Sequence, residues 1–125
     1  MFENEISYAV RGAAFKVHNT LGPGLLESVY EAALEYELIK AVFDVRTQVG
    51  IPVIYEGKNL DLGFRLDLLV NEKVIVEIKS IEAIAPVHYK QLNTYLRLSK
   101  RKLGLLINFN SSSLTDSIKR VANGL

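Results

Sequence analysis

The chain has 125 residues, of which 49% are hydrophobic and 23% are charged, and its formal net charge is +1. These values exclude a disordered chain and predict one folded domain over residues 1–125 with a sizeable core. The absence of cysteine excludes disulfides and thiolate metal sites, and it fits a reducing cytoplasm. There is neither a signal-peptide pattern nor a run of about 18 apolar residues, so no membrane segment is expected.

The two parts of the chain differ in charge. Residues 1–85 carry 8 Lys and Arg against 13 Asp and Glu, a balance of −5. Residues 86–125 carry 7 Lys and Arg against Asp116 alone, a balance of +6. A basic segment beside an acidic body indicates either a polyanionic partner or an ordinary solvated surface.

The first forty residues predict two helices. Apolar residues recur at helical spacing over residues 4–19, so this stretch is expected to form an amphipathic helix. The glycines and proline of NTLGPG, residues 19–24, end it. A second helix is predicted from about Leu25 to Lys40.

The middle of the chain changes to β-branched residues in alternation, which is typical of strands. Three strands are predicted, near residues 43–55, 60–70 and 74–79, with YEGKNL as the turn between the first two.

The remaining residues continue the pattern. A third helix is predicted over roughly 86–100, and KLGLLINF reads as a short buried strand. The last segment, LTDSIKRVANGL, fits either a helix or a strand. The order α-α-β-β-β-α-β predicts an α/β fold in which helices flank a central mixed sheet.

The stretch LDLLVNEKVIVEIKS, residues 66–80, is a predicted β-hairpin that carries charges among apolar residues. Side chains alternate along a strand, so each strand has two faces. One predicted face is wholly apolar: Phe64, Leu66, Leu68 and Val70, with Val74, Val76 and Ile78. The other is apolar near the turn and charged away from it: Leu69 and Ile75, then Arg65, Asp67, Glu77 and Lys79.

The length of the hairpin loop decides whether these charges meet. A three-residue loop, Asn71–Lys73, places Asp67 opposite Glu77 and beside Lys79. A two-residue loop would send Glu77 to the other face. We prefer the first register, because only there do the apolar faces match.

Two facing carboxylates repel each other unless a cation lies between them. A divalent ion such as Mg²⁺ or Mn²⁺ would supply that charge through oxygen ligands. The alternative is an ion pair at the end of the sheet, in which Asp67 or Glu77 pairs with Lys79 or Arg65.

Two helices carry further candidate residues. Glu27 lies in the first turn of the second helix, where it either points at the sheet or stabilises the helix dipole. Gln91 and Tyr95 are one turn apart on the third helix, flanked by His88, and form either part of a site or a polar rim. We expect His18 to be an ordinary, partly buried residue.

Three short motifs resemble those of a known family. Asp67 followed by Glu77-Ile78-Lys79 across a hairpin resembles the core motif of the PD-(D/E)XK nuclease superfamily. The segment Gly24–Tyr30 looks like the signature of its small GxxExxY family. The segment Gln91–Tyr95 is similar to the Gln-x-x-x-Tyr motif of the exonuclease branch.

The resemblance implies a restriction-endonuclease-like core and assigns roles to the motif residues. Asp67 and Glu77 would ligate Mg²⁺ or Mn²⁺, with the Ile78 carbonyl and Glu27 as further ligands. Lys79 would orient the attacking water or stabilise the charge of the transition state. The site would also be lined by Gln91 and Tyr95, which hold the scissile strand.

The expected function is therefore a metal-dependent nuclease that acts on nucleic acid, with DNA favoured over RNA. Residues of the basic segment would follow the phosphate backbone: Lys90, Arg97, Lys100 and Arg101. A homodimer is also expected, because so small a domain offers little surface to hold a duplex. The alternatives are a catalytically weak or inactive nucleic-acid-binding module and a protein-interaction domain.

Overall fold

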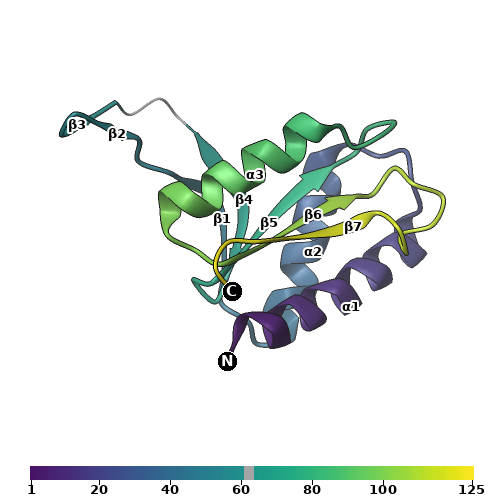
Figure 1. The fold of residues 1–125 in the computed structure, drawn as a ribbon. Coiled ribbons are helices and arrows are strands. Elements are labelled where there is room, and N and C mark those ends of the chain that lie inside the picture. Colours follow the sequence, from purple (N-terminus) through teal and green to yellow (C-terminus); the bar gives the residue numbers. More distant parts are fainter. Residues whose placement is uncertain (61–63) are drawn as a thin grey trace.

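The computed structural model describes residues 1–60 and 64–125, and its centre is a five-stranded mixed sheet (Figure 1). Strands β5 and β6 are parallel, and the other neighbouring pairs are antiparallel. In spatial order the strands are β1 (Val45–Gly50), β4 (Arg65–Val70), β5 (Val74–Lys79), β6 (Leu103–Asn108) and β7 (Ile118–Ala122). The predicted α/β fold with a central mixed sheet is confirmed.

Three helices cover the two faces of this sheet. Helices α1 (Glu3–Leu21) and α2 (Glu27–Lys40) pack on one face, and α3 (Pro86–Ser99) packs on the other (Figure 1). All three were expected from the sequence, although α2 begins two residues later than predicted because Leu26 has an extended backbone, with φ −70° and ψ 151°. In the described part of the chain, none of the helices is long and apolar enough to cross a membrane.

Helix α3 connects the parallel strands β5 and β6, as a crossover between parallel strands requires. It lies close to the sheet because Gly104 has no side chain beneath it. A Cβ atom at Gly104 would come within 2.8 Å of Cδ1 of Leu92, which is buried on α3. This close packing holds α3 against the face of the sheet to which Glu77 also belongs.

The prediction of one strand over residues 43–55 is wrong. Strand β1 ends at Gly50, and Ile54–Tyr55 forms β2, which pairs with β3 (Lys58–Asn59) in a separate two-stranded sheet. Pro52 lies between them and has no backbone N–H to donate to a ladder. The expected YEGKNL turn therefore joins β2 to β3, and this β2–β3 hairpin projects from the body of the protein (Figure 1).

The β4–β5 hairpin has the three-residue loop that the sequence favours. Val70 lies opposite Val74, and Leu68 lies opposite Val76. Of the predicted strand 60–70, β4 begins at Arg65, and residues 61–63 lie outside the described residues.

The predicted faces of this hairpin need one correction. Leu68 packs in the core under α1 and α2, but Leu66 belongs to the cluster under α3. Side-chain alternation along β4 therefore breaks at Asp67, where the pairing with β1 skips Asp67 and Gln48, and Gln48 has a positive φ of 51°.

The C-terminal segment, which the sequence left open, forms strand β7. It pairs with β6 so that Leu103 lies opposite Ala122 and Ile107 opposite Ile118. Strand β6 is buried along its whole length, and β7 covers the edge that β6 would otherwise expose.

Candidate active site

Asp67 on β4 and Glu77 on β5 lie beside each other at the end of the sheet from which the β2–β3 hairpin leaves. The backbone amide of Asp67 donates a hydrogen bond to Oε1 of Glu77 at 3.3 Å. The amide of Ile78 donates to Oδ2 of Asp67 at 2.8 Å. These bonds bring the two side chains together just beyond Leu68 and Val76, the last residues that pair in the β4–β5 ladder, while the Ile78 side chain points into the core on the opposite face.

The surroundings of Glu77 favour its protonated form. Only 7% of the residue is exposed to solvent. Burial, and then the charge and hydrogen bond of Asp67, raise the pKa of Glu77 to about 9, while the charge of Lys79 opposes this rise. At neutral pH Glu77 therefore carries a proton, and a cation that replaces this proton would restore two anionic ligands.

Lys79 follows Glu77 by two residues, so both side chains leave the same face of β5. The residue is half-buried, and its carbonyl accepts a hydrogen bond from the amide of Phe109 at 2.9 Å. Since β5 pairs with strands on both sides, Lys79 is carried by one of the most constrained parts of the sheet. The charge of Lys79 therefore acts on Glu77, although no ion pair joins these two residues.

Glu27 is the first residue of α2 and is tied to the end of β5. Its Oε2 accepts a hydrogen bond from the amide of Ser80 at 3.1 Å. The hydroxyl of Ser80 also donates to the carbonyl of Leu25 at 2.6 Å. These two bonds fix the start of α2 to the residue that directly follows Lys79.

Tyr30 builds the turn that presents Glu27. Its hydroxyl donates to the carbonyl of Gly22 at 2.6 Å and accepts from the amide of Leu25 at 3.1 Å. Its buried ring stacks on Phe109, with 4.6 Å between the ring centroids. Gly24 completes the turn with a positive φ of 95°, a conformation that favours glycine. The spacing of glycine, glutamate and tyrosine in Gly24–Tyr30 therefore has a structural explanation.

Glu31 is a candidate site residue that the sequence reasoning missed. Its Oε1 accepts a hydrogen bond from Nε2 of Gln48 at 2.8 Å. Burial raises the pKa of Glu31, and the nearby charge of Asp67 adds to the rise. The signal was its position four residues after Glu27, which places both side chains on one side of α2.

On α3, Tyr95 faces the carboxyl pair. Burial raises the pKa of the Tyr95 hydroxyl, and the charges of Glu77 and Asp67 add to this effect. The Tyr95 ring lies 6.3 Å from the ring of Phe64, which precedes β4. Gln91, one turn earlier, is exposed on the same side of the helix.

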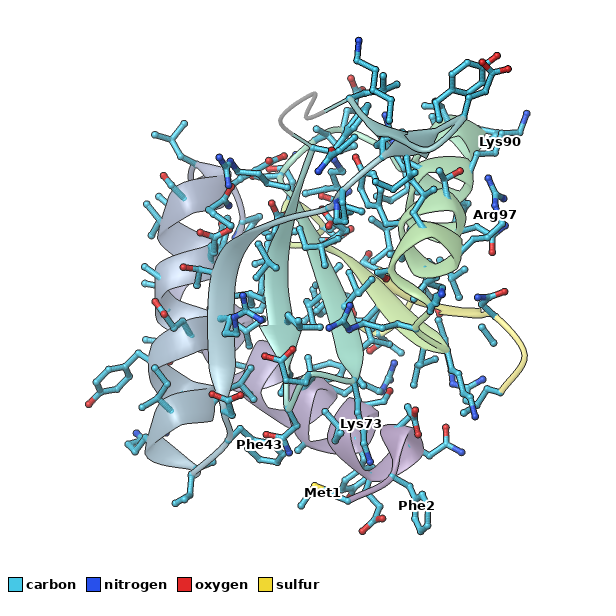
Figure 2. The ribbon with its side chains drawn as sticks, turned by 90° about the vertical axis from the view of Figure 1, so that its left-hand side faces the viewer. Met1, Phe2, Phe43, Lys73, Lys90 and Arg97 are labelled. Atoms are coloured by element: carbon cyan, nitrogen blue, oxygen red, sulfur yellow. The ribbon has the colours of Figure 1, made fainter. Side chains whose placement is uncertain are left out.

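The predicted basic residues are spread along α3 rather than gathered at the site. Lys90 lies near the start of the helix, at the site end, and Arg97 lies near the other end (Figure 2). Lys100 and Arg101 follow the helix, at the end of the sheet opposite to the carboxyl pair.

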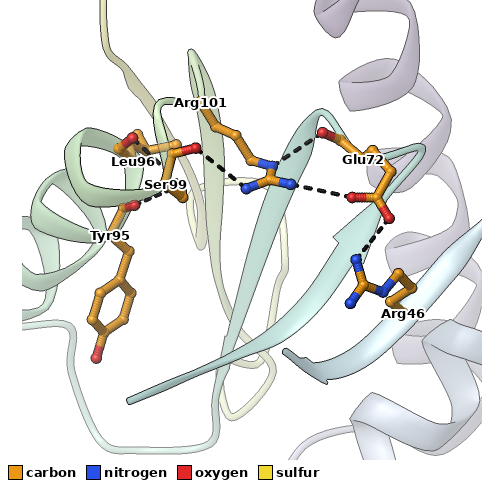
Figure 3. A network of polar contacts seen from close by, with 6 residues as sticks. All are labelled: Arg46, Glu72, Tyr95, Leu96, Ser99 and Arg101. Carbon is orange, nitrogen blue, oxygen red and sulfur yellow. Dashed lines mark hydrogen bonds and ion pairs between the residues drawn. The ribbon is translucent and has the colours of Figure 1, made fainter. Parts of the chain in front are cut away.

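Arg101 takes part in a network at that opposite end (Figure 3). It donates from Nε to the carbonyl of Glu72 at 3.0 Å and forms an ion pair with its carboxylate at 3.2 Å. Arg46 pairs with the same carboxylate at 2.8 Å. The guanidinium of Arg101 thus joins α3 to the β4–β5 turn.

The two histidines have structural partners. Nε2 of His18, which is buried, lies 2.7 Å from the carbonyl oxygen of Ser111. Nδ1 of His88 accepts a hydrogen bond from the amide of Ala85 at 2.9 Å, at the start of α3.

The donor set fits a hard divalent cation in chemical type. Within residues 1–60 and 64–125, no three His, Cys, Asp or Glu side chains lie close enough together to hold a metal ion. However, Mg²⁺ is commonly bound by one or two carboxylates, with water and substrate phosphates as its other ligands. Asp67 and Glu77 supply such a pair once a cation displaces the proton of Glu77.

Comparison with known proteins agrees with this arrangement. The sequence model of the PD-(D/E)XK nuclease superfamily matches residues 4–121, which is nearly the whole chain. The searches of curated proteins and of solved structures found no match to this chain. From the matched span and the fold, the chain belongs to the PD-(D/E)XK nuclease superfamily.

Proposed function

We propose that the protein is a divalent-metal-dependent nuclease that hydrolyses phosphodiester bonds, with DNA as the favoured substrate. The carrying observation is the adjoining carboxyl pair of Asp67 and Glu77, with Lys79 on the same strand as Glu77. Nucleases of this superfamily generally depend on a divalent metal. Within the superfamily, the turn built by Gly24, Glu27 and Tyr30 supports membership of the GxxExxY family.

Asp67 and Glu77 would hold Mg²⁺ or Mn²⁺, and the Ile78 carbonyl and Glu27 are proposed as further ligands, Glu27 directly or through water. When bound, such a cation supplies a water of lowered pKa and stabilises charge on the phosphate oxygens. Glu77 must give up its proton before it can act as a ligand.

The other residues act on the substrate. The ammonium of Lys79 orients the attacking water or stabilises the charge that develops on the phosphoryl oxygens in the transition state. Tyr95 and Gln91 line the site from α3 and hold the scissile strand. Lys90, at the same end of α3, contacts a neighbouring phosphate.

The more distant cations contribute only with a longer substrate. Arg97, Lys100 and Arg101 lie toward the opposite end of the sheet, so they would follow a strand that continues past the site. A homodimer would lengthen this surface.

A cleavage assay tests the proposal. Labelled single-stranded, duplex and branched DNA, together with RNA, are incubated with the protein and Mg²⁺ or Mn²⁺. We expect wild type to cut at least one substrate, and we expect both Glu77→Ala and a chelator to abolish cutting. If folded wild type cuts none of them, the nuclease assignment fails and a binding module becomes the better reading.

A further inference from the structure

The β2–β3 hairpin leaves the sheet directly before the strand that carries Asp67. At its base, the amide of Ile51 donates to the carbonyl of Phe64 at 2.9 Å, and Asp67 follows only three residues later. The hairpin extends outward from this point (Figure 1). A strand that lies along the hairpin therefore leads to the candidate active site.

The hairpin exposes an aromatic ring beside a cation. Tyr55 is 64% exposed and Ile54 is 60% exposed. Tyr55 and Lys58 are directly opposite each other in the ladder, so their side chains leave the same side of the hairpin. An aromatic ring for a base and a cation for a phosphate are the two groups that single-strand-binding surfaces combine.

A second pair of rings continues from the hairpin toward the carboxyl groups. Phe64 is 44% exposed, and its ring contacts that of Tyr95 on α3. Tyr95 in turn lies close enough to Glu77 and Asp67 for their charges to raise the pKa of its hydroxyl. Aromatic side chains thus occur at the hairpin, at its base and at the site itself.

The charges near the hairpin do not suit a duplex. A duplex backbone presents a dense row of phosphates, which a row of cations would have to follow. Lys58 and Arg65 are the cations that the hairpin and the start of β4 contribute.

We infer that the β2–β3 hairpin and Phe64 form a platform on which the bases of an unpaired nucleic acid strand stack as the strand enters the site. The inference rests on the proposed function and narrows its substrate to single-stranded or partly unpaired nucleic acid. Tyr55 stacks on a base, Lys58 contacts the adjacent phosphate, and Phe64 with Tyr95 receives the next bases toward the scissile bond.

Fluorescence anisotropy tests the platform in the non-cleaving Glu77→Gln protein. Three labelled probes of equal length are compared: a single-stranded thymidine oligonucleotide, the same backbone without bases, and a duplex. We expect the single strand to bind about tenfold more tightly than either of the others, because base stacking is lost without bases and hidden in a duplex.

Substitutions then locate the effect. Adding Tyr55→Ala should weaken binding of the single strand about tenfold, whereas Tyr55→Phe should retain it. Tyr36→Ala is the matched control, because Tyr36 is 63% exposed but lies on α2, on the other side of the sheet. Binding of the abasic probe should be the same in all of these proteins.

Several outcomes would overturn the platform. They are equal affinity for the abasic and thymidine probes, equal effects of Tyr55→Ala and Tyr36→Ala, or a self-association that Tyr55→Ala abolishes without changing oligonucleotide affinity. In these cases wild type would still cut nucleic acid, so the nuclease proposal would stand. If wild type neither binds nor cuts any probe, the proposed function itself fails.

Discussion

Both ends of the β4–β5 hairpin carry acidic residues, but only the acidic residue at the turn is paired with cations. At the turn, Glu72 is exposed and pairs with Arg46 and Arg101. At the other end, Asp67 and Glu77 face each other, and among the residues described no ion pair joins either of them to a cation. The charge of Glu72 is neutralised by arginines of the same chain, whereas Asp67 and Glu77 have no such partner in the part of the chain that the structure describes and could be neutralised by a bound cation.

The effect on stability distinguishes a structural ion pair from a candidate metal site. An exposed pair such as Glu72 with Arg46 contributes little to stability, because solvent screens its charges. A buried carboxyl group beside another one costs stability unless it is protonated or binds a cation. Glu77 in this position therefore costs stability when it is ionised, which supports the proposed metal site.

The largest expected effect separates these two ends. Glu77→Gln should abolish cleavage and the thermal stabilisation by Mn²⁺, because it removes a ligand at nearly constant volume. Glu72→Gln should leave cleavage unchanged and cost at most about 1 kcal/mol of stability. Cleavage rates and melting curves with and without Mn²⁺ measure both. Equal losses of cleavage and of Mn²⁺-dependent stabilisation in the two variants would show that the two ends of the hairpin do not differ in function.

Lys79 should affect the chemistry without affecting the metal. Lys79→Ala is expected to lower the cleavage rate by about 10²–10³, the usual effect of removing one group that stabilises transition-state charge. The Mn²⁺-dependent rise in melting temperature should persist, because the carboxyl pair is intact. Lys73→Ala, in the turn at the opposite end, is the control. Normal cleavage by Lys79→Ala would remove the role assigned to its ammonium group.

The titration of Glu77 should make the stability of the metal-free protein depend on pH. The pKa of Glu77 is raised in the folded state to about 9 from its ordinary value of 4.5. The folded state therefore binds more protons than the unfolded state between these values, and Glu77 stabilises the fold fully only below about 4.5.

As pH rises through this window, the free energy of unfolding should fall by up to about 1.4 kcal/mol per pH unit. Glu77→Gln should flatten this slope, because glutamine does not titrate. Chemical denaturation at several pH values in the presence of a chelator measures it. Parallel slopes for wild type and the variant would show that Glu77 is not the titrating group.

The smallest expected effect concerns Ser80, which ties Glu27 to the end of β5. Ser80→Ala should raise the Mn²⁺ concentration for half-maximal cleavage by about tenfold, the lower range for losing a group that supports a metal ligand. Alanine keeps the Ser80 amide that bonds to Glu27 but loses the hydroxyl that bonds to the carbonyl of Leu25, so it loosens the start of α2 and with it the Glu27 side chain. In a Glu27→Gln background the same change should have little further effect, because both changes act through the carboxylate of Glu27. Ser113→Ala, in an exposed loop, is the control. Full additivity of the two changes would show that Ser80 does not act through Glu27.

Much of the fold follows from the sequence because its apolar patterns are regular. The three helices and the register of the β4–β5 hairpin were predicted from spacing alone, since a one-residue slip would have turned the apolar faces outward. The break at Pro52 was missed, although a residue without an amide hydrogen is a readable signal. The positive φ of Gln48 and the break in alternation between Leu66 and Leu68 have no such signal in the residue types.

The site shows the same limit. That Asp67 and Glu77 come together could be predicted from the loop length, but the ladder ends at Leu68 and Val76, so the two residues are joined through a backbone amide rather than as a ladder pair. The engagement of Arg101 with Glu72 and the contact of Ser80 with Glu27 could not, because they join segments 29 and 53 residues apart. Charge counts identified the basic segment but not its distribution along α3, which depends on how the helix crosses the sheet.

The most direct test of the account is a calorimetric titration of the protein with Mn²⁺ at pH 7.5 in buffers of different ionisation enthalpy. We expect wild type to bind the ion and to release close to one proton, which comes from Glu77. We expect Glu77→Gln to bind no Mn²⁺. Equal binding by wild type and Glu77→Gln, or binding by wild type without proton release, would contradict the claim that this carboxyl pair is a metal site.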